Sequence, residues 1–499
     1  MNVKLYCDHH FPIGQIDPRI YGSFVEHLGR SVYGGINEPD HPTADDMVFR
    51  QDVLALVKEL NVPIVRYPGG NFVSAYHWED GTGDPAKRPK VADITWYTVE
   101  PNTVGIDEFQ EWAKRAGSQV MMAVNLGTRG PEEAKNCVEY CNFPGGTQYS
   151  EQRRSNGFRE PFGIKYWCLG NEMDGPWQIG CRSAAEYGRL AAQTAKSMKR
   201  MDPAIELTLC GSSSCNMPTF VDWERTVLEE AYDVVDYISL HSYYGNPEDN
   251  TPEYLACSRE MDRYISTVAA ICDIVKEKKH SDKTVQLSFD EWNVWYHSKA
   301  HDRTLEKWIP APPRLEDVYT FEDALVVGCL LITLLRHADR VKMACLAQLV
   351  NVIAPIMTQT GGGCWKQTIF HPFSQASRYA RGEALQTQLR CPSYDGGRYG
   401  LTPCVEAVVT VNREQQQITL LAVNRSLEED AQLELRLQGF EGLQKIRHLV
   451  LSHEDMKACN TQEAPDRVVP AELPLTEETV LPKHSWNTVL FRYEQEAPL

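Results

Sequence analysis

The sequence predicts a (β/α)8 TIM barrel followed by a C-terminal antiparallel β-sandwich of jelly-roll type. Between about residues 20 and 351, short apolar runs alternate with helical stretches, which is the pattern of a parallel sheet. After Leu385 only short β-type runs separated by polar turns follow, which favours a sandwich. Eight runs precede that change, the number that closes a barrel, at 21–28, 64–71, 120–126, 164–172, 206–211, 237–243, 285–291 and 342–351.

The stretches between these runs have helical periodicity. Apolar residues at 53, 56, 57 and 60 form one stripe, and Ser183 with Glu186 makes a capping box before another helix. An open, doubly wound sheet is the competing fold, but no Gly-rich phosphate fingerprint follows the first strand. Gly69-Gly70 indicates only a turn. The barrel is therefore preferred.

We expect the catalytic barrel to span residues 17–384 and the sandwich to span 385–499, with residues 1–16 contributing an N-terminal strand to the sandwich. No Pro- or Ser-rich linker separates the two regions, so they should pack closely. The predicted sandwich strands are 405–411, 418–423, 433–437, 446–451 and 488–492.

Composition excludes several classes of function. A net charge of −18 argues against nucleic acid and other polyanions, which need clustered Lys and Arg, and favours a neutral ligand. No secretory signal is visible at the start, and the apolar run 324–335 is too short to cross a membrane. Fifteen cysteines, an odd number, indicate reduced thiols and a cytoplasmic protein. Cys137 and Cys141 have no second ligand pair, so no metal is expected.

Polar side chains gather where the predicted strands end. In a barrel the C-terminal strand ends carry the chemistry, whereas the opposite ends serve stability. Carboxylates, amides, an Arg, a His and a Tyr would therefore converge on one rim, from Glu26-His27, Arg66 to Asn71, Asn125, Asn171-Glu172, His241 to Tyr244, Asp290 to Asn293 and Gln348.

Glu172 ends the fourth predicted strand and Glu291 the seventh, so the two should face each other across the barrel mouth. Glycoside cleavage uses two carboxyl groups that flank the scissile bond, and a separation of about 5 Å indicates retention through a covalent intermediate. One carboxyl stays protonated to serve the leaving oxygen, and the other is ionised. Asn171 could bond the sugar hydroxyl next to the anomeric carbon.

Each residue also has a structural interpretation. A Glu at a strand end is often a salt-bridge or capping partner, and Arg66 could pair with Glu26 or Glu291. His241 could be a satisfied core histidine or could orient Glu291. Asp290 is expected on the opposite strand face. Tyr243 could pack or hold a carboxylate, and tryptophans 96, 292, 295 and 308 could be core residues or sugar platforms.

The sequence resembles the α-L-arabinofuranosidases of glycoside hydrolase family 51 along most of its length. The resemblance rests on long, ordered matches at 66–72 (RYPGGNF), 125–130 (NLGTRG), 169–177 (LGNEMDGPW), 240–246 (LHSYYGN), 290–296 (DEWNVWY) and 348–355 (QLVNVIAP).

This resemblance implies an exo-acting, retaining enzyme that removes terminal arabinofuranosyl residues from arabinan, arabinoxylan or derived oligosaccharides. Glu172 would be the acid/base and Glu291 the nucleophile. No cofactor is implied, and family members are commonly hexamers. The implied substrate contacts are hydrogen bonds from Glu26, Asn71, Asn171 and Gln348, support of the nucleophile by Tyr243, and pocket walls at Trp96 and Trp295, with Arg66 and His241 as supporting residues.

Three departures from the family pattern lie between residues 75 and 95: Ala75, where the family usually has Gly, and the segments 81–86 and 92–95. These segments lie near Trp96, on the side of the pocket that would bind the leaving group, so the family's specificity carries over least directly there. Alternatives are the same mechanism on xylosides or β-glucans, or a catalytically silent carbohydrate-binding barrel. A metal-dependent barrel hydrolase would need a His-x-His on the first strand, where this chain has Glu26-His27. The aromatic-rich loop 295–308 motivates the exo prediction.

Overall fold

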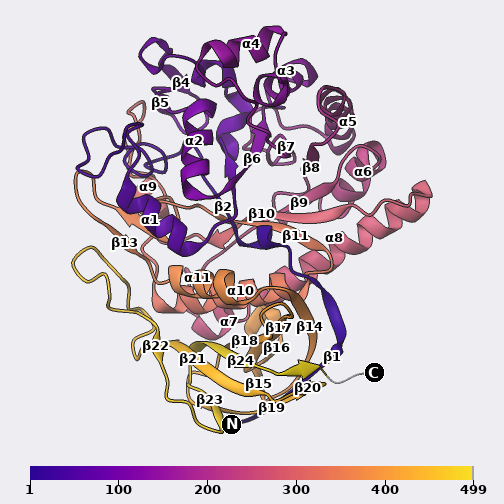
Figure 1. Cartoon of the computed structure of the whole chain (residues 1–499), viewed down its shortest axis with the longest axis vertical. Coiled ribbons are helices and arrows are strands. Elements are labelled where there is room, and N and C mark those ends of the chain that lie inside the picture. Colours follow the sequence, from indigo (N-terminus) through magenta and orange to yellow (C-terminus); the bar gives the residue numbers. More distant parts are fainter. Residues whose placement is uncertain (497–499) are drawn as a thin grey trace.

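The computed structural model describes residues 1–496 and contains the expected closed barrel in its upper part (Figure 1). All eight predicted barrel strands are present, which confirms the fold class. Their order around the barrel is β10-β11-β2-β3-β6-β7-β8-β9, and every neighbouring pair with a printed register is parallel. The strands are β2 (Gly22–Phe24), β3 (Ile64–Tyr67), β6 (Gln119–Val124), β7 (Tyr166–Leu169), β8 (Glu206–Leu209), β9 (Tyr237–Tyr244), β10 (Gln286–Val294) and β11 (Val341–Ala347).

The helices start and stop where local sequence signals place them. Ser183 and Glu186 form the expected capping box, and Gly117 ends another helix in the left-handed region at φ 77°. The helices are α1 (Gln51–Leu60), α2 (Ile106–Ala116), α3 (Pro131–Asn142), α4 (Gln148–Ser155), α5 (Ala184–Met201), α6 (Asp222–Ala231), α7 (Thr251–Leu255), α8 (Ser258–Lys279), α9 (Lys299–Asp302), α10 (Phe321–Arg336) and α11 (Phe370–Tyr379). None in residues 1–496 is long and apolar enough to cross a membrane.

Helix α10 joins the two parts of the molecule. Residues 321–335 are all buried, because the helix packs against α8 and α11 on the barrel side and against β17 (Val405–Asn412) and β18 (Gln417–Asn424) on the other. A Cβ on Gly328 would lie 2.6 Å from the Trp486 ring, so the glycine permits the close approach. The apolar run 324–335 is thus the buried core helix that its sequence indicates.

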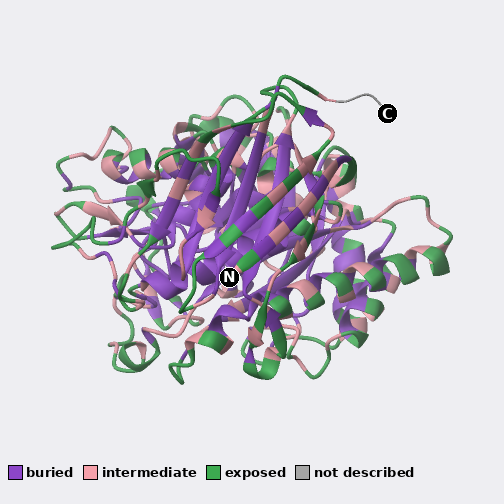
Figure 2. Ribbon diagram, turned by 90° about the horizontal axis from the view of Figure 1, so that it is seen from below, coloured by how far each residue is buried: buried purple, intermediate pink, exposed green. Residues whose placement is uncertain are grey.

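The C-terminal region is one nine-stranded sheet with the order β22-β21-β24-β18-β17-β14-β1-β19-β23. Figure 2 shows long buried strands, which are covered on both faces, beside strands in which buried and exposed residues alternate, which are covered on one face only. The remaining strands of this sheet are β1 (Asn2–Gln15), β14 (Glu383–Arg390), β19 (Ala431–Gln438), β21 (Gln444–Ser452), β22 (Ala471–Glu472), β23 (Thr479–Leu481) and β24 (Ser485–Arg492).

The expectation of a purely antiparallel sheet is wrong for one pair. Strand β1 runs antiparallel to β14 but parallel to β19. Because the whole barrel lies between β1 and β19 in the sequence, no hairpin forces these two strands to be antiparallel. Val3 and Leu5 of β1 are fully buried in the apolar core of this region with Leu385 and Leu420. The expected limit between residues 384 and 385 falls inside β14, and the domain limits stay a prediction.

Four two-stranded sheets complete the fold. β4 (Val91–Asp93) pairs with β5 (Thr98–Glu100), and β12 (Ile356–Thr358) pairs with β13 (Cys364–Lys366), both in connections that follow barrel strands. The others are β15 (Ser393–Asp395) with β16 (Leu401–Pro403) and β20 (Phe440–Glu441) with β25 (Gln495–Glu496). The first two hairpins border the strand ends that carry the predicted site.

Candidate active site

Two glutamates approach each other at the C-terminal ends of the barrel strands. Glu172 lies three residues beyond β7, and Glu291 lies in β10, three strands away around the barrel. One carboxylate oxygen of each, together with one nitrogen of His241, lies within 4.8 Å of the others. The Glu172 and Glu291 side chains are 10% and 7% exposed. The pair is therefore close, nearly buried and still reachable from solvent.

Glu291 is held by one partner on each oxygen. Arg66 on β3 donates from Nη1 to Oε1 at 2.7 Å, and the Tyr243 hydroxyl on β9 donates to Oε2 at 2.8 Å. Burial raises the pKa of Glu291 above its ordinary value, and the Glu172 charge adds to this, while His241, Arg66 and Tyr243 act in the opposite direction. These contacts fix the carboxylate rotamer. Arg66 pairs with Glu291, one of its two expected partners.

Glu172 has a different environment. His241 Nδ1 lies 3.0 Å from Oε1, and the Trp177 indole donates from Nε1 to Oε2 at 2.8 Å. Glu172 adopts φ 43°, a left-handed conformation that is uncommon for residues other than glycine. Trp177 is 53% exposed, which is unusual for so large an apolar ring. The sequence prediction missed Trp177 as a site residue, although it lies only five positions after Glu172.

Asp290 corrects a prediction. It was expected on the opposite face from Glu291, but its Oδ1 lies 3.1 Å from His241 Nε2, inside the barrel, and its Oδ2 lies 3.6 Å from Arg66 Nε. The strand register shifts between Ser288 and Glu291, an irregularity that breaks the normal alternation of faces. His241 thus bridges Asp290 and Glu172, and lies 3.6 Å from Glu291, which it was expected to orient.

His241 carries a positive charge in this setting. Burial alone would lower its pKa, but the nearby Glu291, Asp290 and Glu172 outweigh burial and raise the pKa to about 10. The imidazolium therefore balances part of the negative charge of three carboxylates. Both ring nitrogens face carboxylate oxygens, so neither offers a free lone pair for a metal ion. Although Glu172, His241 and Glu291 are close enough to ligate a cation, their arrangement fits proton chemistry better.

Glu26 anchors the other side of the site. Its Oε1 accepts from the Trp96 indole at 3.0 Å and from the Phe72 amide at 2.9 Å, and its Oε2 lies 3.3 Å from Gln348 Nε2. Burial raises the pKa of Glu26 to about 8, helped by the charge of Glu291. The raised pKa brings the titration of this carboxyl close to neutral pH, and its protonated form can donate a hydrogen bond as well as accept one.

Asn171 links the two halves of the site. Its Oδ1 accepts from Arg66 Nη2 at 2.8 Å, and its Nδ2 donates to Asn71 Oδ1 at 3.1 Å. A Cβ on Gly70 would lie 3.0 Å from Glu291 Oε1 and 3.2 Å from Glu26 Oε2. The second glycine of the turn is thus needed for close approach to both carboxyls, a role that the turn signal alone did not reveal.

Aromatic side chains border the carboxylates. The half-buried Trp295 ring packs edge-on against Tyr243, with ring centres 5.6 Å apart. Trp96 lies in the turn of the β4–β5 hairpin, where Asp93 accepts the amides of Thr95 and Trp96 at 3.0 Å each. Part of the divergent segment 92–95 therefore positions Trp96. All eleven predicted site residues either contact one another or border this cluster.

Comparison with known proteins places this geometry in a family. The model of the α-L-arabinofuranosidase 1 domain matches residues 56–263, and that of the α-L-arabinofuranosidase C-terminal domain matches residues 290–485. An intracellular exo-α-(1→5)-L-arabinofuranosidase 1 from Bacillus subtilis is 57% identical over 94% of this chain and 93% of its own. The chain belongs to the α-L-arabinofuranosidases of glycoside hydrolase family 51.

Solved structures agree with this family assignment. A family 51 α-L-arabinofuranosidase from Bifidobacterium longum superposes with a TM-score of 0.95 at 45% identity, covering 98% of this chain and 99% of its own. An α-L-arabinofuranosidase from Thermotoga maritima, solved as an arabinose complex, gives a TM-score of 0.88 at 32% identity, covering 98% and 99%. The resemblance inferred from the six motifs is thus confirmed.

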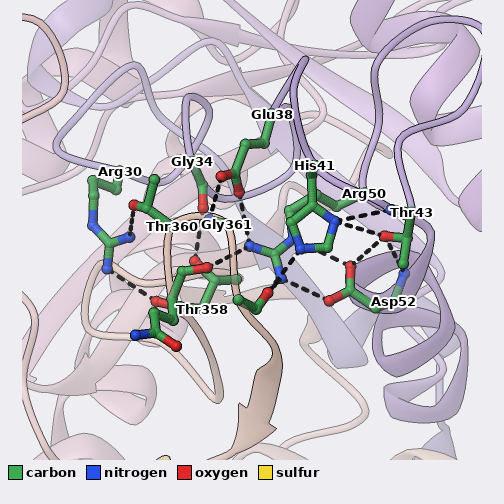
Figure 3. Close-up of polar contacts among 12 residues, drawn as sticks. Arg30, Gly34, Glu38, His41, Thr43, Arg50, Asp52, Thr358, Thr360 and Gly361 are labelled. Atoms are coloured by element: carbon green, nitrogen blue, oxygen red, sulfur yellow. Dashed lines mark hydrogen bonds and ion pairs between the residues drawn. The ribbon is translucent and has the colours of Figure 1, made fainter.

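A buried polar network fixes the loops beside the site of this arabinofuranosidase-family chain (Figure 3). The loop after β2, which contains Glu26, and the β12–β13 hairpin, which comes after Gln348, meet at Arg50. Its fully buried guanidinium contacts Glu38 at 2.9 Å, Asp52 at 2.6 Å and the Gly362 carbonyl at 2.7 Å. His41 donates from Nε2 to the same carbonyl at 2.7 Å. These contacts hold two loops that carry site residues, and the sequence analysis did not identify them.

Proposed function

We propose that this chain is an exo-acting, retaining α-L-arabinofuranosidase that removes terminal non-reducing arabinofuranosyl residues from arabinan, arabinoxylan or derived oligosaccharides. The observation that carries the proposal is the approach of Glu172 and Glu291 to within 4.8 Å at the barrel mouth. A separation of about 5 Å suits direct attack by one carboxylate on the anomeric carbon, whereas inversion needs room for a water between them.

In the first step, the ionised Glu291 attacks the anomeric carbon while Glu172 gives its proton to the leaving glycosidic oxygen. The bond to the leaving group breaks, and a covalent arabinosyl ester forms on Glu291. In the second step, Glu172 removes a proton from water, which attacks the same carbon and releases Glu291. Arg66 and Tyr243 favour the ionised nucleophile through hydrogen bonds of 2.7 and 2.8 Å.

The remaining site residues are proposed to bind the sugar. Their geometry supports this role, because their hydrogen-bonding groups surround the carboxylate pair. Trp96 and Trp295 would form the pocket walls, Arg66 and His241 would support the two glutamates, and the hydroxyl contacts would come from Glu26, Asn71, Asn171 and Gln348.

The loop after β10 supports the exo mode. Trp308 donates its backbone N–H to the Tyr97 carbonyl at 2.6 Å, and Val99 bonds Ile309 at 3.4 Å. These bonds join the connection after β10 to the connection after β3, although β11 and β2 lie between those strands. A loop that spans the mouth in this way would restrict the pocket to one terminal sugar. On linear arabinan we expect arabinose as the only early product; mixed oligosaccharides from the start would contradict the exo mode.

Relatives suggest a cellular setting but not one linkage. The Bacillus subtilis relative is named an intracellular (1→5) enzyme, whereas a 49% identical Bifidobacterium longum relative, covering 93% of this chain and 91% of its own, is named an exo-α-(1→6)-L-arabinofuranosidase. We propose an intracellular location and a homo-oligomer, with the hexamer as a prediction that light scattering would test. The linkage is best settled by initial rates on matched (1→5)- and (1→6)-linked arabinobiosides.

The central test compares the wild type with Glu291→Ala on a panel of p-nitrophenyl glycosides. The wild type should prefer the α-L-arabinofuranoside, and the variant should lose turnover because no nucleophile remains. Added azide should restore activity and give a glycosyl azide of inverted configuration. Preference for a xyloside or glucoside would support the same mechanism but contradict the proposed substrate. Wild-type inactivity on every glycoside would favour a silent carbohydrate-binding barrel.

Glu172→Ala provides a separate test of the acid/base role. Substrates with a good leaving group need no proton, so formation of the glycosyl-enzyme should stay measurable on them. Natural oligosaccharides should be cleaved at a rate lower by two or more orders of magnitude, which is about the contribution of a general acid. An equal loss on both kinds of substrate would contradict the assignment. Asp107→Asn, a buried carboxylate bonded to Tyr140 away from the glutamates, is the matched control.

A further inference from the structure

A second cavity, separate from the carboxylate site, lies where helix α8 and the end of α10 meet the C-terminal sheet. Its volume is about 620 Å³, within the usual range of small-molecule sites. Residues of α8, α10, β14 and β17 line it, and none of the predicted active-site residues does. The proposed hydrolysis therefore does not account for it.

The cavity is rich in arginine although the whole chain carries a charge of −18. Five arginines line it against three carboxylates. Two of those carboxylates are already occupied: Glu406 bonds the buried Arg425 at 2.8 Å, and Asp262 bonds His337 at 2.8 Å. Positive charge is thus left over at the cavity.

Of the remaining arginines, Arg398 pairs with Glu253 at 3.4 Å, whereas the other three are exposed and poorly paired. Arg263 has no ion-pair partner within 4.0 Å in the part of the chain that the structure describes, and Arg336 reaches only Glu406, at 3.7 Å. Arg259 bonds a backbone carbonyl, that of Tyr399, at 3.0 Å. Guanidinium groups that converge on a concave surface without partners are suited to a bidentate anion.

Two further features favour a phosphate-bearing ligand. Arg259 lies in the first turn of the 22-residue helix α8, where the helix dipole adds positive potential. Leu389, Val405 and Ala407 provide an apolar part of the lining, which could contact the organic part of a ligand. We propose that this cavity binds a small molecule carrying a phosphate or diphosphate group.

The test measures binding of inorganic pyrophosphate and adenosine diphosphate to the wild-type chain by calorimetry and thermal shift. Both should bind and raise the melting temperature beyond the effect of sodium chloride at equal ionic strength. The Arg263→Ala/Arg336→Ala variant should bind at least about tenfold more weakly, because each charge-assisted contact contributes about that factor. Arg189→Ala/Arg200→Ala removes the same charge from the exposed face of α5 and should bind as the wild type does.

Several results would overturn the proposal. Pyrophosphate could act no differently from chloride, or both double variants could lose binding equally, which would indicate a general charge effect. Citrate could bind as tightly as pyrophosphate, which would exclude selectivity for phosphate. A change in the mass of the Arg263→Ala/Arg336→Ala protein in solution would identify the cavity as a contact between copies. The proposed function is tested separately, by cleavage of p-nitrophenyl arabinofuranoside without added anion. Failure of anion binding would therefore leave that result unaffected.

Discussion

The two glutamates at the barrel mouth have the same side chain but different neighbours. Glu291 is bonded by a guanidinium and a phenol, both of which favour its ionised form. Glu172 instead shares the imidazole of His241 with Asp290. The two carboxyls therefore have different hydrogen-bond donors, and the donors on Glu291 suit a nucleophile, which must be ionised. Asp290 contributes to that difference through His241, without contacting Glu172 itself.

Asp290→Asn should move the alkaline limb of the pH–activity profile to lower pH. Removing this negative charge lowers the pKa of His241 from about 10, because Asp290 is one of the groups that raise it. The imidazolium, which supports both glutamates, then loses its proton at a lower pH, and activity falls with it. The dependence of kcat/KM on pH with an arabinofuranoside measures the shift. An unchanged limb with reduced kcat would indicate a purely structural role, and Asp107→Asn again serves as the buried-carboxylate control.

Irregular backbone decides the site at the level of elements. Strand β10 would normally direct Asp290 and Glu291 to opposite faces, but its shifted register brings both into the barrel. The loop after β2 and the connection after β11 are irregular too. The first contains Glu26 and the second contains Gln348, and contacts with Arg50 hold both segments in place. Arg50 is the centre of those contacts, since it bonds both segments while fully buried.

Arg50→Ala should therefore lower the free energy of unfolding strongly, by about 3–5 kcal/mol, because the largely buried carboxylates of Glu38 and Asp52 lose their ion-pair partner. Arg115→Ala is the matched comparison: it also removes an arginine bound to the same loop, at Asp45 and Asp46, but its side chain is 27% exposed and that of Asp46 is 78% exposed. We therefore expect a smaller loss from Arg115→Ala, because exposed pairs contribute only about 0–1 kcal/mol. Chemical denaturation measures both values, and equal losses would contradict the assignment of the buried network.

Across the whole molecule, buried acids make stability depend on pH. Burial raises the pKa of Glu26 to about 8 and those of Asp107 and Asp174 to about 6, so the unfolded chain releases these protons at lower pH than the folded one. The free energy of unfolding then falls as pH rises from about 4 to 8. His241, with its pKa raised to about 10, adds a loss between about 6.5 and 10.

We expect a lower melting temperature at pH 8.5 than at pH 5.5. Burial lowers the pKa of His371 to about 4, which opposes the trend between about pH 4 and 6.5 but not above it. Calorimetry at several pH values and constant ionic strength measures the profile. A melting temperature that rises from pH 6.5 to pH 8.5 would contradict the burial of these acids in the folded state.

Local patterns in the sequence predicted the fold class, the family, the eight barrel strands and the meeting of Glu172 and Glu291 at the barrel mouth. These follow from local periodicity and from residues at strand ends, where the barrel topology dictates which side chains converge. Four features emerged only from the folded chain: the face of Asp290, the contact of Trp177 with Glu172, the parallel pairing of β1 and the network around Arg50. Each depends on a register shift or on contacts between distant segments, and no local pattern encodes either.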